Sequence, residues 1–283
     1  IFDPLDPKTI YLGTLRQGLF ISFDAGESWQ PTKISQGAVE ELVINPKDRC
    51  VLYASMTNKI IKSLDCARNF DVVYFEPRGQ IRLTALAIDS YNPSIIYVGN
   101  SVGDIIQSQN GGNSWAKLDY RFPTAIIKIL VSFHDTRNIY VLTRTDGVFF
   151  SSDGGDSFQS WERALRPFPR SFDAVDLVES HENPDQLIFA SRYGLLQTFD
   201  QGKRFEEISI LTRPAEIPIY AAALNPNNSL DLYYTDSANF YHSPDGGATW
   251  TVSPLPFARP AVQILLDPTN TNVIYLGLAG GKR

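Results

Sequence analysis

One pattern recurs along the whole chain and limits the possible folds more than any other feature: Ile or Leu followed by an aromatic residue in a short apolar run. Its seven copies centre on Tyr11, Tyr53, Tyr97, Tyr140, Phe189, Tyr233 and Tyr275. Successive copies are separated by roughly 42 to 49 residues, a spacing typical of repeat architectures. Nearly every repeat carries three further short apolar runs separated by turn residues. Four short antiparallel strands per repeat predict an all-β protein, a single β-propeller domain over residues 1–283.

The number of blades depends on which feature is counted. The aromatic pattern predicts seven blades, over residues 1–36, 37–80, 81–121, 122–171, 172–214, 215–257 and, as a partial blade, 258–283. A second motif, described next, occurs six times. We expect seven blades in a chain clipped at one or both ends. Six blades are the alternative, which leaves the apolar run at residues 273–278 without a place.

The second motif is a turn with the pattern Ser/Thr-x-Asp-x-Gly-x-Ser/Thr-Trp/Phe. Its copies, some of them degenerate, lie at residues 22–29, 63–70, 108–115, 151–158, 198–205 and 243–250, and their acidic or amide residues are Asp24, Asp65, Asn110, Asp153, Asp200 and Asp245. Such a carboxylate can accept backbone N–H groups of its own turn, and the glycine permits positive φ. The Asp position of the motif supplies at most one carboxylate per turn, whereas Ca²⁺ takes six to eight oxygen ligands. We therefore expect a structural role, without a metal or cofactor.

Composition excludes several classes of protein. The formal net charge of −6 argues against a general nucleic-acid binder. The longest apolar runs are too short and too interrupted to cross a bilayer, so no transmembrane segment is predicted. The sequence has no spacing typical of serine hydrolases, nucleotide-binding loops or zinc sites.

The turn motif resembles the Asp box, or BNR repeat, of sialidases, sortilin-type receptors, xyloglucan-cleaving hydrolases and photosystem II assembly factors. The resemblance covers nearly the whole chain and implies the propeller fold. It also implies that the turns lie at the rim remote from the ligand site. The Phe/Tyr-Arg-Ile-Pro signature of sialidases is missing, and residues 120–123 only approach it in the wrong repeat. The xyloglucanases place their cleft between two propeller domains, whereas one is predicted here, so we expect a protein that is not an enzyme.

The two cysteines of the chain lie in one repeat. Cys50 begins the second strand of that repeat, and Cys66 lies in its degenerate turn, "SLDCARNF". Folding the second and third strands together places the two residues nearly opposite each other. We predict a disulfide, which would imply an exported protein in a periplasmic, lumenal or cell-surface location. The alternative is a pair of buried thiols in a cytosolic propeller.

Antiparallel order divides the loops of every repeat between two ends. Most arginines fall at the end opposite the turn motif, where the long loops at residues 71–82 and 159–171 also lie. Arginine with aromatic residues is typical of interfaces and of carboxylate or phosphate binding. The predicted contact residues are Arg78, Arg82, Arg144, Arg163, Arg166, Arg170, Arg192, Trp161 and Phe168.

These features predict a non-catalytic, exported scaffold that binds a protein partner or an anionic surface. It resembles the assembly-factor propellers in its single domain, its Asp boxes and its arginine-rich face. The partner is expected to belong to a membrane-associated or cell-surface complex. The alternative is a sialidase-like glycoside hydrolase or a glycan-binding propeller.

Overall fold

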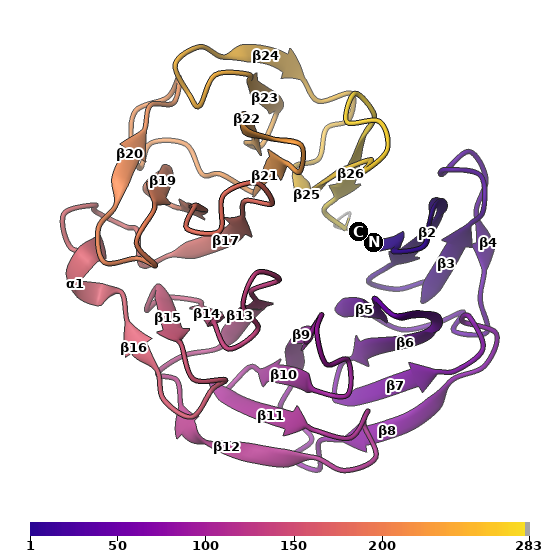
Figure 1. Cartoon of the computed structure of the whole chain (residues 1–283). Helices are drawn as coiled ribbons and strands as arrows, with labels where there is room; N and C mark the ends of the chain where they lie inside the picture. Colours follow the sequence, from indigo (N-terminus) through magenta and orange to yellow (C-terminus); the bar gives the residue numbers. More distant parts are fainter. Residues whose placement is uncertain (281–283) are drawn as a thin grey trace. The chain divides into compact units, whose positions relative to one another are not determined.

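The computed structural model describes residues 1–280 and is built almost entirely of antiparallel strands (Figure 1). Within residues 1–280, six sheets have four strands and one has two. The chain is therefore an all-β protein with the β-propeller fold, made of four-stranded antiparallel blades. It divides into two compact units, the first comprising Ile1–Thr143 and Ser151–Phe158 and the second comprising Arg144–Phe150 and the described residues from Gln159 onward.

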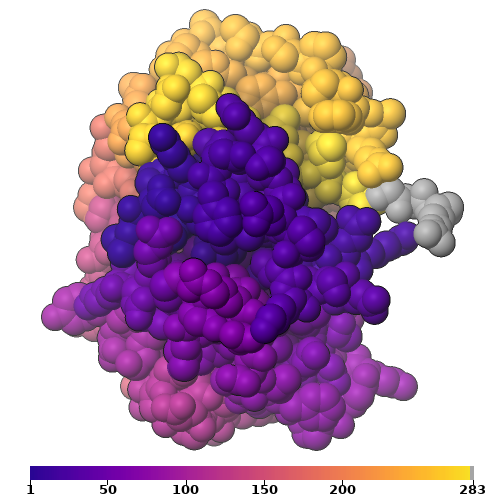
Figure 2. All heavy atoms as spheres, turned by 90° about the vertical axis from the view of Figure 1, so that its right-hand side faces the viewer, coloured from indigo at the N-terminus to yellow at the C-terminus, as the bar shows by residue number. Residues whose placement is uncertain are grey.

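The first unit contains three complete sheets and the start of a fourth. Their strands are β1 (Phe2–Asp3), β2 (Asp6–Gly13), β3 (Leu19–Ser22) and β4 (Gln30–Pro31); β5 (Glu41–Asn45), β6 (Asp48–Met56), β7 (Lys59–Ser63) and β8 (Asp71–Phe75); β9 (Leu83–Ile88), β10 (Ile96–Asn100), β11 (Asp104–Ser108) and β12 (Ala116–Arg121); and β13 (Ile126–Val131) and β14 (Ile139–Thr143). The fourth sheet is completed by β15 (Val148–Ser151) and β16 (Gln159–Ser160). Buried side chains of neighbouring blades pack together in shared clusters, and the indigo and purple blades form a continuous surface in Figure 2.

The second unit contains two complete sheets, a two-stranded sheet and one short helix. Its elements after β16 are α1 (Glu162–Leu165); β17 (Ala174–Glu179), β18 (Leu187–Ser191), β19 (Leu195–Thr198) and β20 (Glu206–Ile208); β21 (Ala221–Asn225), β22 (Asn228–Thr235), β23 (Asn239–Ser243) and β24 (Thr251–Pro254); and β25 (Ala261–Leu266) and β26 (Ile274–Leu278). The first strands of successive sheets, β17, β21 and β25, are neighbours. Among the described residues, no helix is long and apolar enough to span a membrane.

The blade count matches the six-bladed alternative. The expected seventh unit is present as the two-stranded sheet β25–β26, so the apolar run at residues 273–278 pairs with the preceding strand. Ala261 faces Leu278 and Leu265 faces Tyr275 in that pair.

The recurring aromatic and the recurring turn meet in the first unit. Tyr53 donates its hydroxyl to the carbonyl of Gly111 at 3.0 Å, and Tyr97 donates to Gly154 at 3.2 Å. In both cases the aromatic of one blade reaches the turn of the next blade, and its ring is buried. The rings are buried because a blade stacked between two others buries both faces of its inner strands. In strand β10, for example, all five residues are buried. The recurring aromatic residue of one blade and the recurring turn of the next blade thus form a single contact between the two blades.

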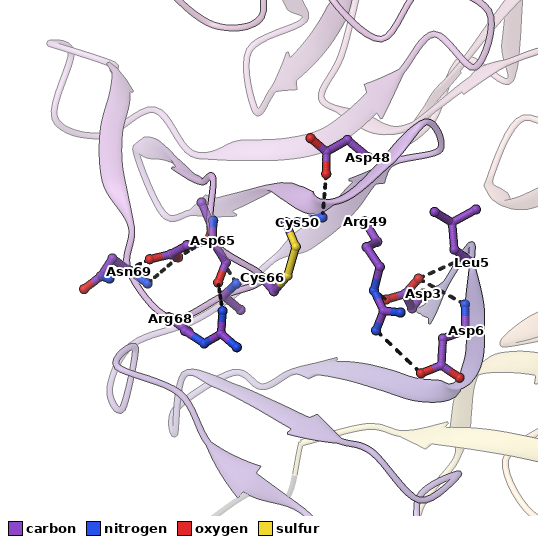
Figure 3. Close-up of a disulfide and its surroundings, with 12 residues drawn as sticks. Asp3, Leu5, Asp6, Asp48, Arg49, Cys50, Asp65, Cys66, Arg68 and Asn69 are labelled. Atoms are coloured by element: carbon purple, nitrogen blue, oxygen red, sulfur yellow. Dashed lines mark hydrogen bonds and ion pairs between the residues drawn. A yellow bond between two sulfur atoms is a disulfide. The ribbon is translucent and has the colours of Figure 1, made fainter.

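The predicted disulfide is present in the second blade. It joins Cys50 at the start of β6 to Cys66 just after β7, with 3.8 Å between the Cα atoms (Figure 3). The backbone N–H of Cys66 also donates to the carbonyl of Cys50 at 3.1 Å. The link follows from the hairpin register, in which Leu52 faces Ser63.

Candidate functional site

Three of the predicted arginines line one pocket in the second unit. The pocket has a volume of about 420 Å³ and is lined by Arg144, Thr145, Arg170, Asp173, Ala174, Val175, Arg192, Pro218, Ile219 and Tyr220. These residues come from turns that follow the second strand of a blade, at Arg144 and Arg192, from connections that lead into β17 and β21, and from the first two residues of β17. Both kinds of connection belong to the end that the sequence assigns to partner binding.

Backbone hydrogen bonds join the loops that carry the arginines. Gly147, with a φ of 71°, closes the turn after Arg144 and donates its N–H to Phe172 at 3.0 Å. The backbone N–H of Arg192 donates to the carbonyl of Asp173, also at 3.0 Å. Arg170 itself has a φ of 66°, a left-handed conformation that side chains other than glycine seldom adopt. The arginine positions are therefore set by main-chain contacts between loops.

The pocket carries an excess of positive charge. Arg170 lies 3.9 Å from Asp173, and both side chains are partly exposed. Among the described residues, no hydrogen bond or ion pair involves the guanidinium of Arg144 or of Arg192. Asp173 is the single acid among the lining residues. Arginine stays protonated at any physiological pH, and its planar donors match carboxylate and phosphate oxygens.

The remaining wall of the pocket is apolar. Ile219 is buried, and Val175, Pro218 and Tyr220 are half-buried beside it. Sequence reasoning missed these residues. The sequence feature that could have indicated this apolar wall is the stretch "IPIY" at residues 217–220, which lies in the loop directly before β21. A ligand that fits this pocket has an anionic group next to an apolar group.

The other predicted contact residues of the second unit lie elsewhere. Arg163 lines a different pocket, and Arg166 pairs with Glu162 at 2.7 Å. Phe168 packs edge-on against Tyr193, with 5.2 Å between ring centroids. Trp161 is only 4% exposed. Its ring lies against Phe205 and under Gly202, so it is a core residue rather than an exposed contact.

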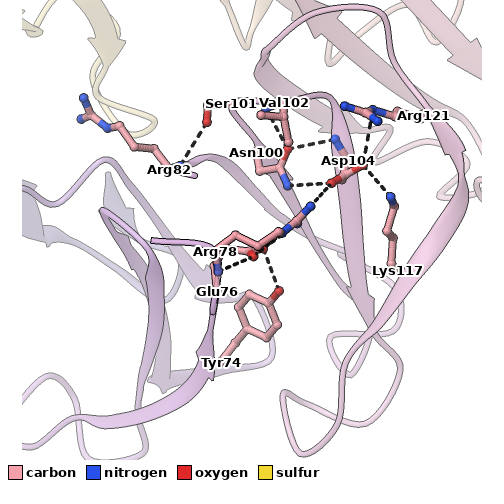
Figure 4. A network of polar contacts seen from close by, with 10 residues as sticks. All are labelled: Tyr74, Glu76, Arg78, Arg82, Asn100, Ser101, Val102, Asp104, Lys117 and Arg121. Atoms are coloured by element: carbon pink, nitrogen blue, oxygen red, sulfur yellow. Dashed lines mark hydrogen bonds and ion pairs between the residues drawn. The ribbon is translucent and has the colours of Figure 1, made fainter. Parts of the chain in front are cut away.

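In the first unit, Arg78 and Arg82 are each held by acidic residues, and Figure 4 shows those around Arg78. Arg78 contacts Glu76 at 2.6 Å and Asp104 of the next blade at 3.1 Å. Lys117 also contacts Asp104, at 2.7 Å, and Arg82 pairs with Glu40. Both carboxylates that receive Arg78 are 1% exposed. Arg78 therefore serves as a clamp between blades, which its position in a long loop did not reveal.

The six turn motifs share one internal hydrogen-bond pattern. In the turn at residues 243–250, Gly247 donates its N–H to the Ser243 hydroxyl at 2.8 Å, and Thr249 donates its N–H to Asp245 at 2.8 Å. The same two bonds occur at Ser22 and Asp24, Ser63 and Asp65, Ser108 and Asn110, Ser151 and Asp153, and Thr198 and Asp200. The Ser28 hydroxyl and N–H lower the pKa of Asp24 to about 2, and Ser157 does the same for Asp153. These side chains are engaged in holding their own turns.

Comparisons with known proteins agree on the fold. No family model matches the sequence. Over 111 residues, 39% of this chain, the sequence is 28% identical to vacuolar protein sorting/targeting protein 10 of Arthroderma otae, and the match spans 7% of that protein. The chain is similar in structure to the GH74 xyloglucanase from Xanthomonas campestris, with a TM-score of 0.78 and 18% identity over 99% of this chain and 50% of the enzyme.

A third similarity covers nearly the whole of both proteins. YCF48 from Cyanidioschyzon merolae has a TM-score of 0.75 and 16% identity over 99% of this chain and 92% of YCF48. Another structure of YCF48 holds a D1 peptide, with a TM-score of 0.72 and 15% identity over 97% of this chain and 87% of that chain. At these identities the structural similarities establish the propeller fold and no activity.

Proposed function

We propose that the chain is a non-catalytic, exported binding propeller that holds an acidic segment of a protein partner in the pocket of Arg144, Arg170 and Arg192. The observation that carries the proposal is the convergence of these three arginines on one pocket with an apolar wall. A peptide carboxylate beside an apolar side chain satisfies both parts of the lining. The peptide held by YCF48, a propeller of similar fold, supports the same kind of ligand.

The disulfide supports the exported location, because disulfides persist mainly in oxidising compartments. A scaffold or assembly role in a membrane-associated or cell-surface complex is the setting that we infer for the partner. A glycosidase of the usual kind needs two carboxylates flanking the scissile bond. The lining of the arginine pocket offers Asp173 alone, and Arg170 lies beside it, which favours binding over catalysis.

The test is titration of the whole chain with a fluorescent peptide of alternating acidic and apolar residues, followed by anisotropy. We expect Arg144→Glu and Arg192→Glu each to weaken binding by at least about tenfold, because a charge-assisted hydrogen bond contributes roughly 1.5–3 kcal/mol. Arg259→Glu is the matched control, since Arg259 is exposed, lies in the same unit and does not line the pocket. Equal losses in all three variants would refute a specific site. Turnover of xyloglucan or of a sialyl substrate by the chain would refute the non-catalytic assignment.

A further inference from the structure

The second unit contains another pocket that the proposed function does not use. Its volume is about 570 Å³, within the size range of small-molecule sites. One wall comes from the outer part of the fourth blade, with Phe150, Gln159, Ser160, Trp161, Arg163 and Ala164. The other wall is the turn of the next blade, with Gln201, Gly202 and Lys203.

The turn that forms the second wall lines the pocket with the recurring glycine of the motif, Gly202, and with Gln201 and Lys203, which occupy positions that vary among the six turns. Gln201 has a φ of 59°; the same position is a glycine with left-handed φ in three other turns, and it is Ala25 or Cys66, also with left-handed φ, in the remaining two. A large polar side chain is seldom found in this conformation. Lys203 lies two residues further on, and Arg204, which is outside the pocket lining, takes the place of the Ser, Thr or Asn of the other turns and binds Asp200 at 3.0 Å. The turn thus keeps its internal hydrogen bonds while Gln201 and Lys203 line the pocket.

The floor of the pocket is rigid. A Cβ atom added to Gly202 would lie 2.1 to 2.5 Å from atoms of the Trp161 ring, so the turn rests directly on that side chain. The ring of Trp161 in turn packs against Phe189 and Phe205, with centroid separations of 6.4 and 5.2 Å. This packing sets the spacing of the two walls.

The charge of the pocket is wholly positive. Arg163 and Lys203 are exposed, and no ion pair or side-chain hydrogen bond involves either one among the described residues. None of the lining residues is acidic. The nearest acid in sequence, Glu162, pairs with Arg166 at 2.7 Å. An anion that enters the pocket meets two cations without a competing internal counter-ion.

The uncharged polar groups of the lining narrow the choice of ligand. Gln159 and Gln201 each present a carboxamide, with two N–H donors and an acceptor oxygen, and Ser160 adds a hydroxyl. A peptide finds little to hold it here, because β16 has only two residues for strand pairing and Trp161 is already covered. A ligand rich in hydroxyl groups uses the carboxamides fully. We propose that this pocket binds a carboxylated saccharide, with Arg163 and Lys203 on the carboxylate and Gln159 and Gln201 on the hydroxyls.

The test is calorimetric titration of the whole chain with digalacturonate, with neutral galactobiose and with a short Asp-Glu peptide. We expect digalacturonate to bind at least about tenfold more tightly than either of the others. Arg163→Gln and Lys203→Gln should each weaken that binding at least fivefold. Arg213→Gln, an equal change of charge at an exposed residue outside this pocket, should leave it within twofold.

Two further variants keep the result interpretable. Gln201→Gly places glycine at a left-handed position, so the turn should fold at least as well, yet it removes a carboxamide and should weaken digalacturonate binding severalfold. Arg144→Glu should weaken the acidic peptide of the proposed function without changing digalacturonate binding, which separates the two sites. Equal binding of the neutral disaccharide, preference for the peptide, or no binding of digalacturonate at millimolar concentration would each overturn the proposal.

Discussion

Replacing Asp104 by Asn is expected to destabilise the first unit markedly while leaving its shape unchanged. Asp104 is 1% exposed, forms an ion pair with Lys117 at 2.7 Å and accepts a hydrogen bond from Arg78 at 3.1 Å. The carboxamide of Asn has nearly the same size but no charge, so both charge-assisted bonds are lost. Such a bond contributes roughly 1.5–3 kcal/mol when buried. The two cations are about half exposed, at 49% and 51%, so each is discounted by about half.

The expected loss for Asp104→Asn is therefore about 1.5 to 3 kcal/mol in the free energy of unfolding. Urea denaturation followed by circular dichroism measures it. The matched control is Asp119→Asn, because Asp119 is exposed on the same sheet, in strand β12, and its change should stay within about 0.5 kcal/mol. If the two variants unfold at the same urea concentration, Asp104 is not a clamp between blades.

The same pair predicts a dependence on pH. Burial alone would raise the pKa of Asp104, but hydrogen bonds from Lys117, Asn100 and Arg78 outweigh it and hold the pKa below its usual value. A carboxyl whose pKa is lower in the folded state stabilises the protein above its unfolded pKa of about 3.9. That stability is lost as the pH falls through the folded pKa. The difference between wild type and Asp104→Asn should thus be full at pH 7 and shrink below about pH 4.

Two further changes test how the blades are fastened. Replacing both Cys50 and Cys66 by Ser removes a link across 16 residues and should lower the free energy of unfolding by about 3 kcal/mol; a melting temperature that is the same with and without reductant would contradict this. Gly202→Ala forces a Cβ against Trp161 at a φ of 85° and should cost about 3 kcal/mol. Gly79→Ala, with open space around the added Cβ, should leave the melting temperature nearly unchanged, and equal losses would show that the Gly202 contact is not needed.

Local features of the fold could be predicted from the sequence because they depend on neighbours along the chain. The turn at residues 243–250 carries its own donors and acceptors, so Ser243 and Asp245 identify it without knowledge of the rest of the molecule. The link between Cys50 and Cys66 follows in the same way from one hairpin. The number of blades was harder to predict, because the two-stranded sheet β25–β26 carries the same aromatic pattern as the first two strands of a four-stranded blade.

The candidate site was predicted only in part, because its residues meet through contacts between blades. Antiparallel order placed Arg144, Arg170 and Arg192 in the correct class of loop, but nothing in the sequence distinguished them from Arg78. The difference arises from Asp104, which comes from the next blade and forms an ion pair with the guanidinium of Arg78.

The sequence by itself determined the strands, the turns, the repeat and the disulfide, since each of these is satisfied within a few residues or within one blade. Only the tertiary structure decided which charged and aromatic groups remain available. Trp161 is buried because Gly202 of the next blade lies on its ring. Arg144 and Arg192 line a pocket because loops from different blades are joined at Gly147 and Asp173. Whether a ligand can reach a side chain depends on how neighbouring blades pack, and the sequence of a single repeat does not contain that information.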